Sequence, residues 1–233
     1  MKIINQIFKG LFDNTKNKLR QIKDHKSYRL YPSNPRHDDV YIVEFPKSGV
    51  TWLSTIITNL NLLISNKQEK ATFYNLQQYI PDIHASLDLS YDPLWSFPKF
   101  RFIKSHDFYN KNYLFVIYLI RDPYKVMNSY YIFNKQLGNF TGTFEEFIRH
   151  DNFGIKAWSE HISSWLNRGV SNQKIHLVKY EDLINNPLDE IRNIYKNLGL
   201  FIDDDFIKNS INLSDMTNMK VSEEFHKKYN PNY

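Results

Sequence analysis

Apolar residues recur along the chain in two alternating patterns, one typical of strands and one typical of helices. Short apolar runs predict strands at residues 40–45, 100–104, 114–120 and 175–179. Apolar residues at helical spacing predict helices at residues 51–65, 124–133, 143–149, 155–167 and 187–198. The run at 114–120 is unbroken, so we expect this strand to be buried on both faces in the centre of a parallel sheet.

Two helix ends carry local signals. Thr143 and Glu146 have the spacing of a capping box at the start of one helix. Gly199 stands in the stop position after the helix at 187–198. Because strands alternate with helices, the sequence predicts a single three-layer α/β domain over residues 38–233, with a central parallel sheet and helices on both faces.

An N-terminal extension, residues 1–37, precedes this domain. Its apolar residues have the spacing of an amphipathic helix: Ile3, Ile4, Ile7, Phe8, Leu11 and Phe12, with Lys2 and Lys9 among them. Such a helix would either pack on the domain or lie on an anionic lipid surface. It lacks the continuous apolar core of a signal peptide, and the Pro-containing stretch at 31–39 resembles a linker.

The composition narrows the class of protein. A chain of 233 residues with 42% hydrophobic residues can bury one sizeable core, and no apolar run approaches the roughly 20 residues of a membrane-spanning helix. The absence of cysteine excludes disulfides, zinc–thiolate sites and thiol nucleophiles and suits a reducing compartment. We therefore expect a cytoplasmic protein, with any peripheral membrane contact made through the N-terminal helix.

The net charge of +5 does not point to nucleic acid, because most of it lies in the extension. Residues 1–37 hold nine Lys or Arg and two Asp or Glu, and the rest of the chain has a balance of −2. We therefore expect no nucleic-acid partner. We also expect no metal, because these histidines show no metal-ligand spacing: His25, His37, His84, His150, His176 and His226.

Candidate chemistry begins at residues 45–52, which read Phe-Pro-Lys-Ser-Gly-Val-Thr-Trp between a predicted strand and a predicted helix. A turn here points the backbone N–H groups of residues 49–51 at one spot, where they and the helix dipole attract an anion. Lys47 adds a positive charge, and Ser48 and Thr51 add hydroxyl donors. The pattern predicts a P-loop-like phosphate site, although a plain structural turn would show the same single glycine.

An ordinary ATP- or GTP-binding loop is disfavoured. Its pattern, G-x-x-x-x-G-K-[ST], places the lysine after the second glycine, whereas Lys47 precedes the only glycine of this loop. Two other candidates, His106 and Arg121, follow predicted strands at the edge where open α/β sheets bind ligands. A neutral imidazole can accept a proton near pH 7. Arg121 would form either a structural salt bridge or, together with Ser129 about two helical turns later, a phosphate site.

The loop resembles that of the cytosolic-type sulfotransferase family, P-K-S-G-T-T-W. Four further segments match the family in order and at similar spacing. Residues 102–106 resemble its I-K-T-H segment, 118–131 its strand and helix that hold the 3′-phosphate, 153–165 its Y-G-x-W-x-x-H-x-x-x-W helix, and 178–183 its K-Y-E-D-L strand end. The likeness covers roughly residues 40 to 200, and the ordered set of motifs is far more specific than any one of them.

The resemblance implies a donor, 3′-phosphoadenosine-5′-phosphosulfate (PAPS), and a product, 3′-phosphoadenosine 5′-phosphate (PAP). It implies that the 5′ end would be held by Lys47, Ser48, Gly49, Val50 and Thr51. Trp52 would stack on the adenine, Tyr180 would lie near it, and Arg121 and Ser129 would hold the 3′-phosphate.

The resemblance also implies the chemistry, an in-line displacement at sulfur. His106 would be the general base that takes a proton from a hydroxyl or amine of a small-molecule acceptor. Lys47 and Lys104 would offset the charge that develops on the transferred group, and Ser129 would restrain Lys47. The residues Trp158, His161 and Trp165 recur on one helical face, and we interpret them as core.

The chain departs from the family in three places. Val50 stands where the family usually has threonine, and the family's C-terminal R-K-G segment is missing, with Lys227 and Lys228 as the only basic candidates. The interval at 65–100 is short and must supply much of the acceptor pocket. Its aromatic and histidine side chains suggest an aromatic-lined cavity, although some would belong to an ordinary core: Phe73, Tyr74, Tyr79, His84, Trp95 and Phe97.

Two rival functions stay open. A phosphoryl-transfer enzyme would share the loop but bind ATP with Mg²⁺, whereas a sulfotransferase would bind PAPS without metal. A non-catalytic nucleotide-binding protein would keep the loop but need neither His106 nor Lys104. Nothing in the sequence indicates an oligomeric state.

Overall fold

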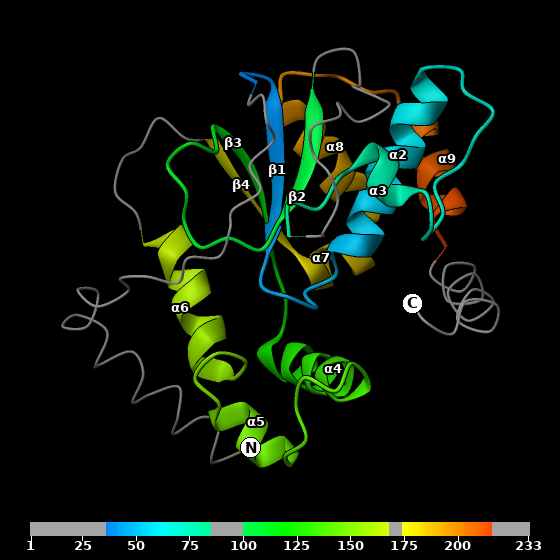
Figure 1. The fold of residues 1–233 in the computed structure, drawn as a ribbon. Coiled ribbons are helices and arrows are strands. Elements are labelled where there is room, and N and C mark those ends of the chain that lie inside the picture. Colours follow the sequence, from blue (N-terminus) through cyan, green and yellow to red (C-terminus); the bar gives the residue numbers. More distant parts are fainter. Residues whose placement is uncertain (1–35, 85–99, 168–173, 216–233) are drawn as a thin grey trace. The chain divides into compact units, whose positions relative to one another are not determined.

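The computed structural model describes residues 36–84, 100–167 and 174–215. The centre of this region is a parallel sheet of four strands in the order β2-β1-β3-β4 (Figure 1). The strands are β1 (Asp39–Glu44), β2 (Arg101–Ser105), β3 (Phe115–Ile120) and β4 (Lys174–Lys179). They confirm the four strands predicted from the apolar runs, and β3 is an inner strand, as its unbroken run indicated.

All four strands run in the same direction, so their carboxyl ends meet at one edge of the sheet. Val43 pairs with Ser105, Glu44 with Leu119, and Ile120 with Lys179. The residues that follow these strand ends therefore gather at one place, although they are far apart in the sequence.

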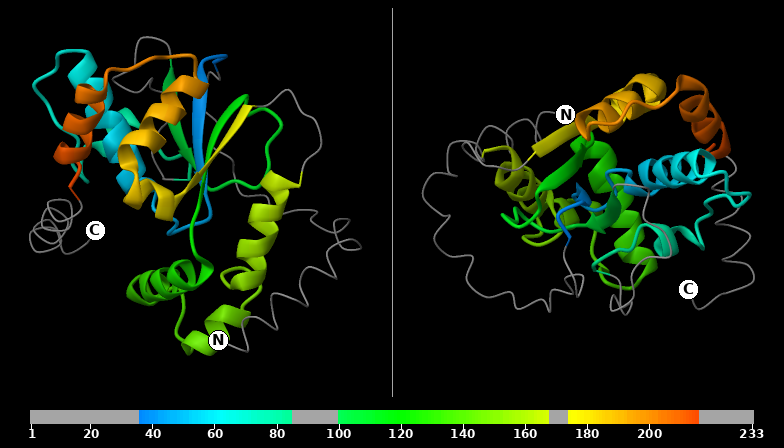
Figure 2. Two further views of the ribbon diagram at one scale, coloured as in Figure 1. Left: turned by 180° about the vertical axis from the view of Figure 1, so that it is seen from behind. Right: turned by 90° about the horizontal axis from the view of Figure 1, so that it is seen from above.

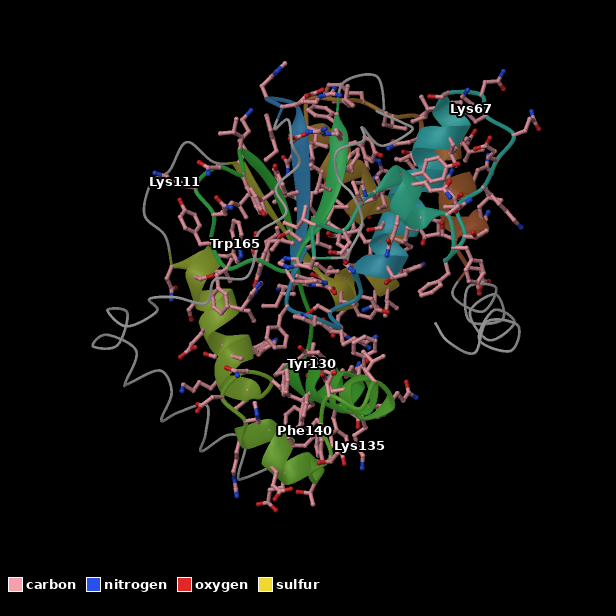
Figure 3. The ribbon with its side chains drawn as sticks, in the orientation of Figure 1. Lys67, Lys111, Tyr130, Lys135, Phe140 and Trp165 are labelled. Carbon is pink, nitrogen blue, oxygen red and sulfur yellow. The ribbon has the colours of Figure 1, made fainter. Side chains whose placement is uncertain are left out.

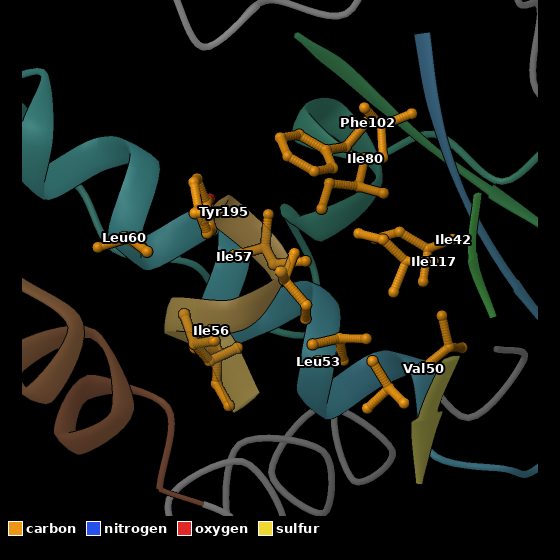
Figure 4. Close-up of a cluster of buried hydrophobic side chains, with 14 of the residues drawn as sticks. Ile42, Val50, Leu53, Ile56, Ile57, Leu60, Ile80, Phe102, Ile117 and Tyr195 are labelled. Atoms are coloured by element: carbon orange, nitrogen blue, oxygen red, sulfur yellow. The ribbon is translucent and has the colours of Figure 1, made fainter. Parts of the chain in front are cut away.

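One face of the sheet packs against α2 (Val50–Ile64), α8 (Pro187–Asn197) and α9 (Asp204–Leu213). α8 and α9 lie side by side in both views of Figure 2. Ile42 and Ile117 of the sheet meet Leu53 and Ile57 of α2 in this core (Figure 4). Each such fully buried side chain contributes roughly 1.5–3 kcal/mol.

Two buried asparagines tie α2 to the helices beside it. Asn61 Oδ1 accepts a hydrogen bond of 2.7 Å from the Tyr195 hydroxyl on α8, and Asn59 Nδ2 donates one of 2.9 Å to Ser214 Oγ at the end of α9. Because a buried polar group is costly without a partner, these bonds favour one arrangement of the three helices. They hold the helix that carries the predicted anion loop at its N-terminus.

The other face packs against α6 (Ile155–Leu166), mainly through Trp165 (Figure 3). The Trp165 indole N–H donates to the Asp107 carbonyl at 2.9 Å, and His161 Nδ1 lies 2.9 Å from the Tyr118 hydroxyl. Trp158, His161 and Trp165 are all buried, which confirms their interpretation as core. Helices thus cover both faces, as predicted.

Two further helices, α4 (Pro123–Gln136) and α5 (Phe144–Arg149), come after β3 in the chain and pack together through aromatic side chains. Tyr130 of α4 and Phe147 of α5 belong to an aromatic cluster with Phe140 and Phe153. Figure 3 places Tyr130 and Phe140 beside these helices. The other helices are α3 (Leu76–Tyr79) and α7 (Tyr180–Asn185). In the described residues no helix is both long and apolar enough to cross a bilayer.

The predicted helix ends are confirmed. Thr143 Oγ1 accepts from the Glu146 N–H at 3.3 Å, and Glu146 Oε2 accepts from the Thr143 N–H at 2.7 Å, which completes the capping box. Gly199 has φ +79°, and its N–H and that of Leu200 bond back to the last turn of α8. By contrast, α3, α7 and α9 were not predicted. The first two are one to two turns long and carry too few residues for a periodic pattern.

The predicted N-terminal helix lies outside the described residues. The same holds for Trp95 and Phe97 of the expected pocket and for Lys227 and Lys228. Their predicted roles stay predictions.

Candidate active site

The segment after β1 forms a tight turn with unusual backbone angles. Lys47 has φ +75° and Gly49 has φ +114°, both in the left-handed region. A side chain in this region costs roughly 1–2 kcal/mol, so the fold holds Lys47 in a strained conformation. Ser48 is buried and donates through its hydroxyl to the Phe45 carbonyl at 2.8 Å, which stabilises the turn from within.

The backbone N–H groups of the turn have different partners. The Val50 N–H donates to Glu44 Oε2 at 2.8 Å, and the Lys47 N–H also interacts with this carboxylate. Within the described residues, the N–H groups of Gly49 and Thr51 donate no hydrogen bond. Two of the three amides of the predicted cradle therefore have no described partner, whereas the third already holds a carboxylate of the chain itself.

Arg121, which follows β3, reaches this turn. Its Nη1 donates to the Lys47 carbonyl at 3.3 Å, and its guanidinium lies 4.3 Å from the ring centroid of Tyr180. Its Nε is buried and has no hydrogen-bond partner among the described residues, and no described carboxylate forms a salt bridge with it. A half-buried guanidinium without an anionic partner fits an anion site better than a structural salt bridge.

Lys47 contacts the helix that carries Ser129. Its Nζ lies 4.5 Å from the ring centroid of Phe133, four residues after Ser129 on α4. Residues four apart share a helix face, so Ser129 lies on the side of α4 that faces the loop. The lysine ammonium thus rests on an aromatic face, the favourable position for a cation beside a ring.

Two aromatic rings flank the turn. Tyr180, the first residue of α7, packs on Gly49, and its ring centroid lies 6.1 Å from that of Trp52 in an edge-to-face arrangement. The Trp52 indole N–H donates to the Ser214 carbonyl at 2.9 Å. The structure therefore brings Trp52, Tyr180, Arg121 and the turn together, as the sequence predicted.

His106 lies at the same edge. Its Nδ1 is 3.1 Å from the Glu44 carbonyl oxygen, which can only accept, so Nδ1 carries the proton and Nε2 keeps its lone pair. Burial, followed by the nearby charge of Lys104, lowers the pKa of His106 to about 3. The ring is thus neutral over the physiological range, in the tautomer that leaves Nε2 able to accept a proton.

Lys104 and His106 share a carboxylate that the sequence did not indicate. Asp82 Oδ2 is 2.7 Å from Lys104 Nζ and 4.0 Å from His106 Nε2. Asp82 reaches them because residues 81–83 pair with β2, through the Lys104 N–H to the Pro81 carbonyl at 2.8 Å. A lone aspartate after a proline carries no recognisable signal, and the contact exists only in the fold.

Glu44 was missed for a different reason. It is the last residue of β1 and only 2% exposed. Because β1 is buried on both faces, its sequence has no alternation of polar and apolar residues that would show where the Glu44 side chain lies. A charged residue in a predicted buried strand was the available signal, because such residues are almost never fully buried without a partner.

The expected aromatic pocket is only partly described. Tyr79 belongs to the core beside α2, and its hydroxyl donates to Glu69 at 2.6 Å. Phe73 and Tyr74 pack on each other with ring centroids 5.8 Å apart. His84 lies near the site, with its ring centroid 5.6 Å from that of His106.

Comparison with known families gives a match over most of the chain. The model of the sulfotransferase domain matches residues 37–232. Mouse sulfotransferase 1 family member D1 is 29% identical over 201 residues, which cover 79% of this chain and 67% of that protein. Human sulfotransferase 4A1 is 29% identical over 184 residues, which cover 72% and 62%. The chain thus spans about two thirds of the length of these relatives.

Solved structures with the same fold include complexes with PAP. Mouse sulfotransferase SULT7A1 in complex with PAP superimposes with a TM-score of 0.56 and 20% identity, over 83% of this chain and 69% of that one. Retinol dehydratase in complex with androsterone and the inactive cofactor PAP gives a TM-score of 0.58 and 18% identity, with the same coverage. At this level of identity the likeness shows the fold.

Proposed function

The chain belongs to the sulfotransferase domain family, and from that premise we propose that it transfers a sulfuryl group from PAPS to a hydroxyl or amine of a small molecule. One contact carries the proposal: His106 Nδ1 to the carbonyl of Glu44, the residue from which the anion turn starts. This bond fixes the imidazole beside the turn and leaves Nε2 as the proton acceptor.

The described residues fit a nucleotide with two separate anionic groups. Lys47 and the N–H groups of Gly49 and Thr51 would hold the 5′ end, with Ser48 and Val50 completing the turn. Arg121, with its unpartnered buried Nε, would hold the 3′-phosphate together with Ser129. The adenine would lie against the edge-to-face pair of Trp52 and Tyr180.

PAPS supplies the sulfuryl group, and the residues of the chain supply proton transfer and charge. His106 Nε2 would take the acceptor's proton as the new bond to sulfur forms. Lys47 would stabilise negative charge on the departing 5′-phosphate, and Lys104 would stabilise charge on the sulfuryl oxygens. No covalent intermediate with the protein is needed, because positioning and electrostatics account for this kind of displacement.

The acceptor would be a small molecule bound on the His106 side of the site. The structural neighbours include complexes with androsterone and with retinol, both of which are described for those proteins alone. By analogy we propose an apolar alcohol or phenol as the first class to test. A cytoplasmic location, with membrane contact through residues 1–37, is a further proposal that rests on the sequence.

The test is a calorimetric titration of the full chain with PAP, and separately with ATP and Mg²⁺. We expect PAP to bind without metal and ATP to bind at least about tenfold more weakly, because Arg121 would lack its 3′-phosphate. Tighter binding of Mg·ATP would favour the phosphoryl-transfer alternative and overturn the proposal.

Turnover is tested with sulfate-labelled PAPS and a panel of phenols, alcohols and amines. We expect the wild type to transfer the labelled group to at least one of these acceptors and His106→Ala to transfer it to none. PAP binding without transfer to any of them would favour a non-catalytic nucleotide-binding protein.

A further inference from the structure

Glu44 lies inside the proposed donor site. Its side chain follows β1 into the turn, where Oε2 accepts the Val50 N–H at 2.8 Å and the Lys47 N–H also interacts with the carboxylate. The residue is 2% exposed, so solvent does not reach the carboxylate. The amide of Val50 is one of the three that the turn offers to an anion.

Charged and titratable groups face this carboxylate from every element around it. Lys104 approaches from β2 and Lys47 from the turn. The Tyr118 phenol faces it from β3 and the Tyr180 phenol from α7. The carbonyl of Glu44 itself holds the His106 ring. Burial outweighs the two lysines and raises the pKa of Glu44 to about 7.

A bound phosphosulfate and an ionised Glu44 would compete for the same groups. Both are anions, and Lys47 attracts Glu44 and would attract the phosphosulfate. Glu44 also holds the Val50 N–H, which a phosphate bound in the turn would otherwise meet. In a site with little water their mutual repulsion is weakly screened. A neutral carboxyl group removes the repulsion and gains an O–H that can donate to an anion.

We propose that Glu44 is a donor-site residue that takes up one proton when the phosphate end of the nucleotide binds; this inference rests on the function proposed above. The ionised carboxylate occupies the amide of Val50 in the free protein. The protonated carboxyl group then shares the turn with the 5′-phosphate of the nucleotide. Donor affinity is therefore coupled to pH through a residue of the chain itself.

The coupling has a definite sign. If a group must gain a proton for the ligand to bind, the affinity for the ligand falls as pH rises above the pKa of that group in the free protein. The fall is at most about tenfold per pH unit. Glu44→Gln keeps an oxygen that can accept the Val50 N–H but carries no charge. We expect the variant to bind PAP like the wild type at pH about 6 and about tenfold more tightly at pH about 8.5.

The experiment titrates full-length wild type and Glu44→Gln with PAP over this pH range. The phosphates of PAP titrate in both series, so the ratio of the two dissociation constants isolates Glu44. Glu145→Gln is the matched control, because Glu145 is an exposed glutamate on α5 that pairs with Arg149, and it should follow the wild type. A ratio that does not change with pH would overturn the inference.

A second measurement needs no variant. The binding heat of PAP to the wild type at pH about 8 is measured in two buffers of different ionisation enthalpy, which counts the protons taken up. We expect close to one proton more than Glu44→Gln takes up, and an equal uptake by both contradicts the inference. If PAP binds and its affinity changes with pH in the same way for the wild type and Glu44→Gln, only this inference is rejected. If PAP does not bind at any pH, the proposed function is rejected as well.

Discussion

The ring of Tyr180 lies so close to the backbone of Gly49 that a Cβ built there would come within 2.3 Å of the ring Cε2 atom. Gly49 also has φ +114°, which side chains rarely adopt. Tyr180 can lie there because α7 starts directly at the end of β4, beside the strand that leads to Arg121. The glycine is thus required both by the turn and by the aromatic wall that covers it.

Gly49→Ala should therefore harm both stability and binding. We expect a loss of about 2–4 kcal/mol in the free energy of unfolding, from left-handed strain and from displacement of the ring. PAP affinity should fall more than about tenfold, because the turn amides and Tyr180 both move. Urea unfolding and calorimetric titration measure the two effects.

Gly138→Ala is a control that introduces the same left-handed backbone strain as Gly49→Ala but no overlap with a neighbouring side chain. Gly138 has φ +72° and nothing within 4 Å of a built Cβ. This control should lose only about 1 kcal/mol and keep PAP affinity. Equal effects of the two variants would show that the contact with Tyr180 does not matter.

Arg121→Ala should remove the preference for a nucleotide with a 3′-phosphate. We expect PAP affinity to fall about tenfold to hundredfold, because hydrogen bonds between charged groups are lost. Affinity for adenosine 5′-phosphate should change much less. Competition between the two nucleotides in the variant and the wild type measures this preference.

Arg149→Ala is the matched control, since Arg149 lies exposed on α5 and pairs with Glu145. It should leave both affinities unchanged. If Arg121→Ala weakened PAP and adenosine 5′-phosphate equally, Arg121 would not contact the 3′-phosphate.

His106→Ala should abolish transfer while it preserves the donor site. Loss of a general base typically lowers turnover about a hundredfold to ten-thousandfold. The dissociation constant of PAP should change less than about threefold, because the ring contacts the turn only through the Glu44 carbonyl. His37→Ala, which changes an exposed histidine, should behave as the wild type.

The protonation state of His106 gives a separate test. Burial lowers its pKa to about 3, so the imidazole should stay neutral as pH falls from about 8 to about 5. The C2 proton resonance in an NMR titration, assigned by comparison with His106→Ala, reports this state. A midpoint near pH 6.5 would contradict the burial of the ring, which is the main cause of the lowered pKa.

Asp82→Asn should slow transfer by releasing Lys104. Asn keeps an acceptor for the His84 N–H but loses the charge that pairs with Lys104 at 2.7 Å. The charge of Asp82 raises the pKa of His106, so its removal should lower that pKa further. We expect turnover to fall about tenfold, because the Lys104 ammonium is no longer held in place, and the dissociation constant of PAP to change less than about threefold.

Asp151→Asn removes the carboxylate of an exposed pair with Lys156 and should change neither quantity. If Asp82→Asn weakened PAP binding as much as it slowed transfer, Asp82 would have a purely structural role.

Local patterns in the sequence predicted the frame of this protein. Four apolar runs became four parallel strands, and Thr143 and Gly199 mark the helix ends that they indicated. The motif around Lys47 predicted a turn between strand and helix, and the carboxyl ends of parallel strands brought Arg121, His106 and Tyr180 to the same edge. The strands, the helix ends and the turn each depend on a few consecutive residues, so local patterns in the sequence record them directly.

The tertiary structure decided which groups are already engaged. Glu44 takes the Val50 amide, Asp82 joins Lys104 to His106, and Arg121 has no described carboxylate partner. Burial and charge pairing depend on residues that are distant in the sequence, and the pKa values of Glu44 and His106 follow from them. The order of strands and helices was therefore encoded locally, whereas the electrostatics of the site arise only when the sheet edge closes around it.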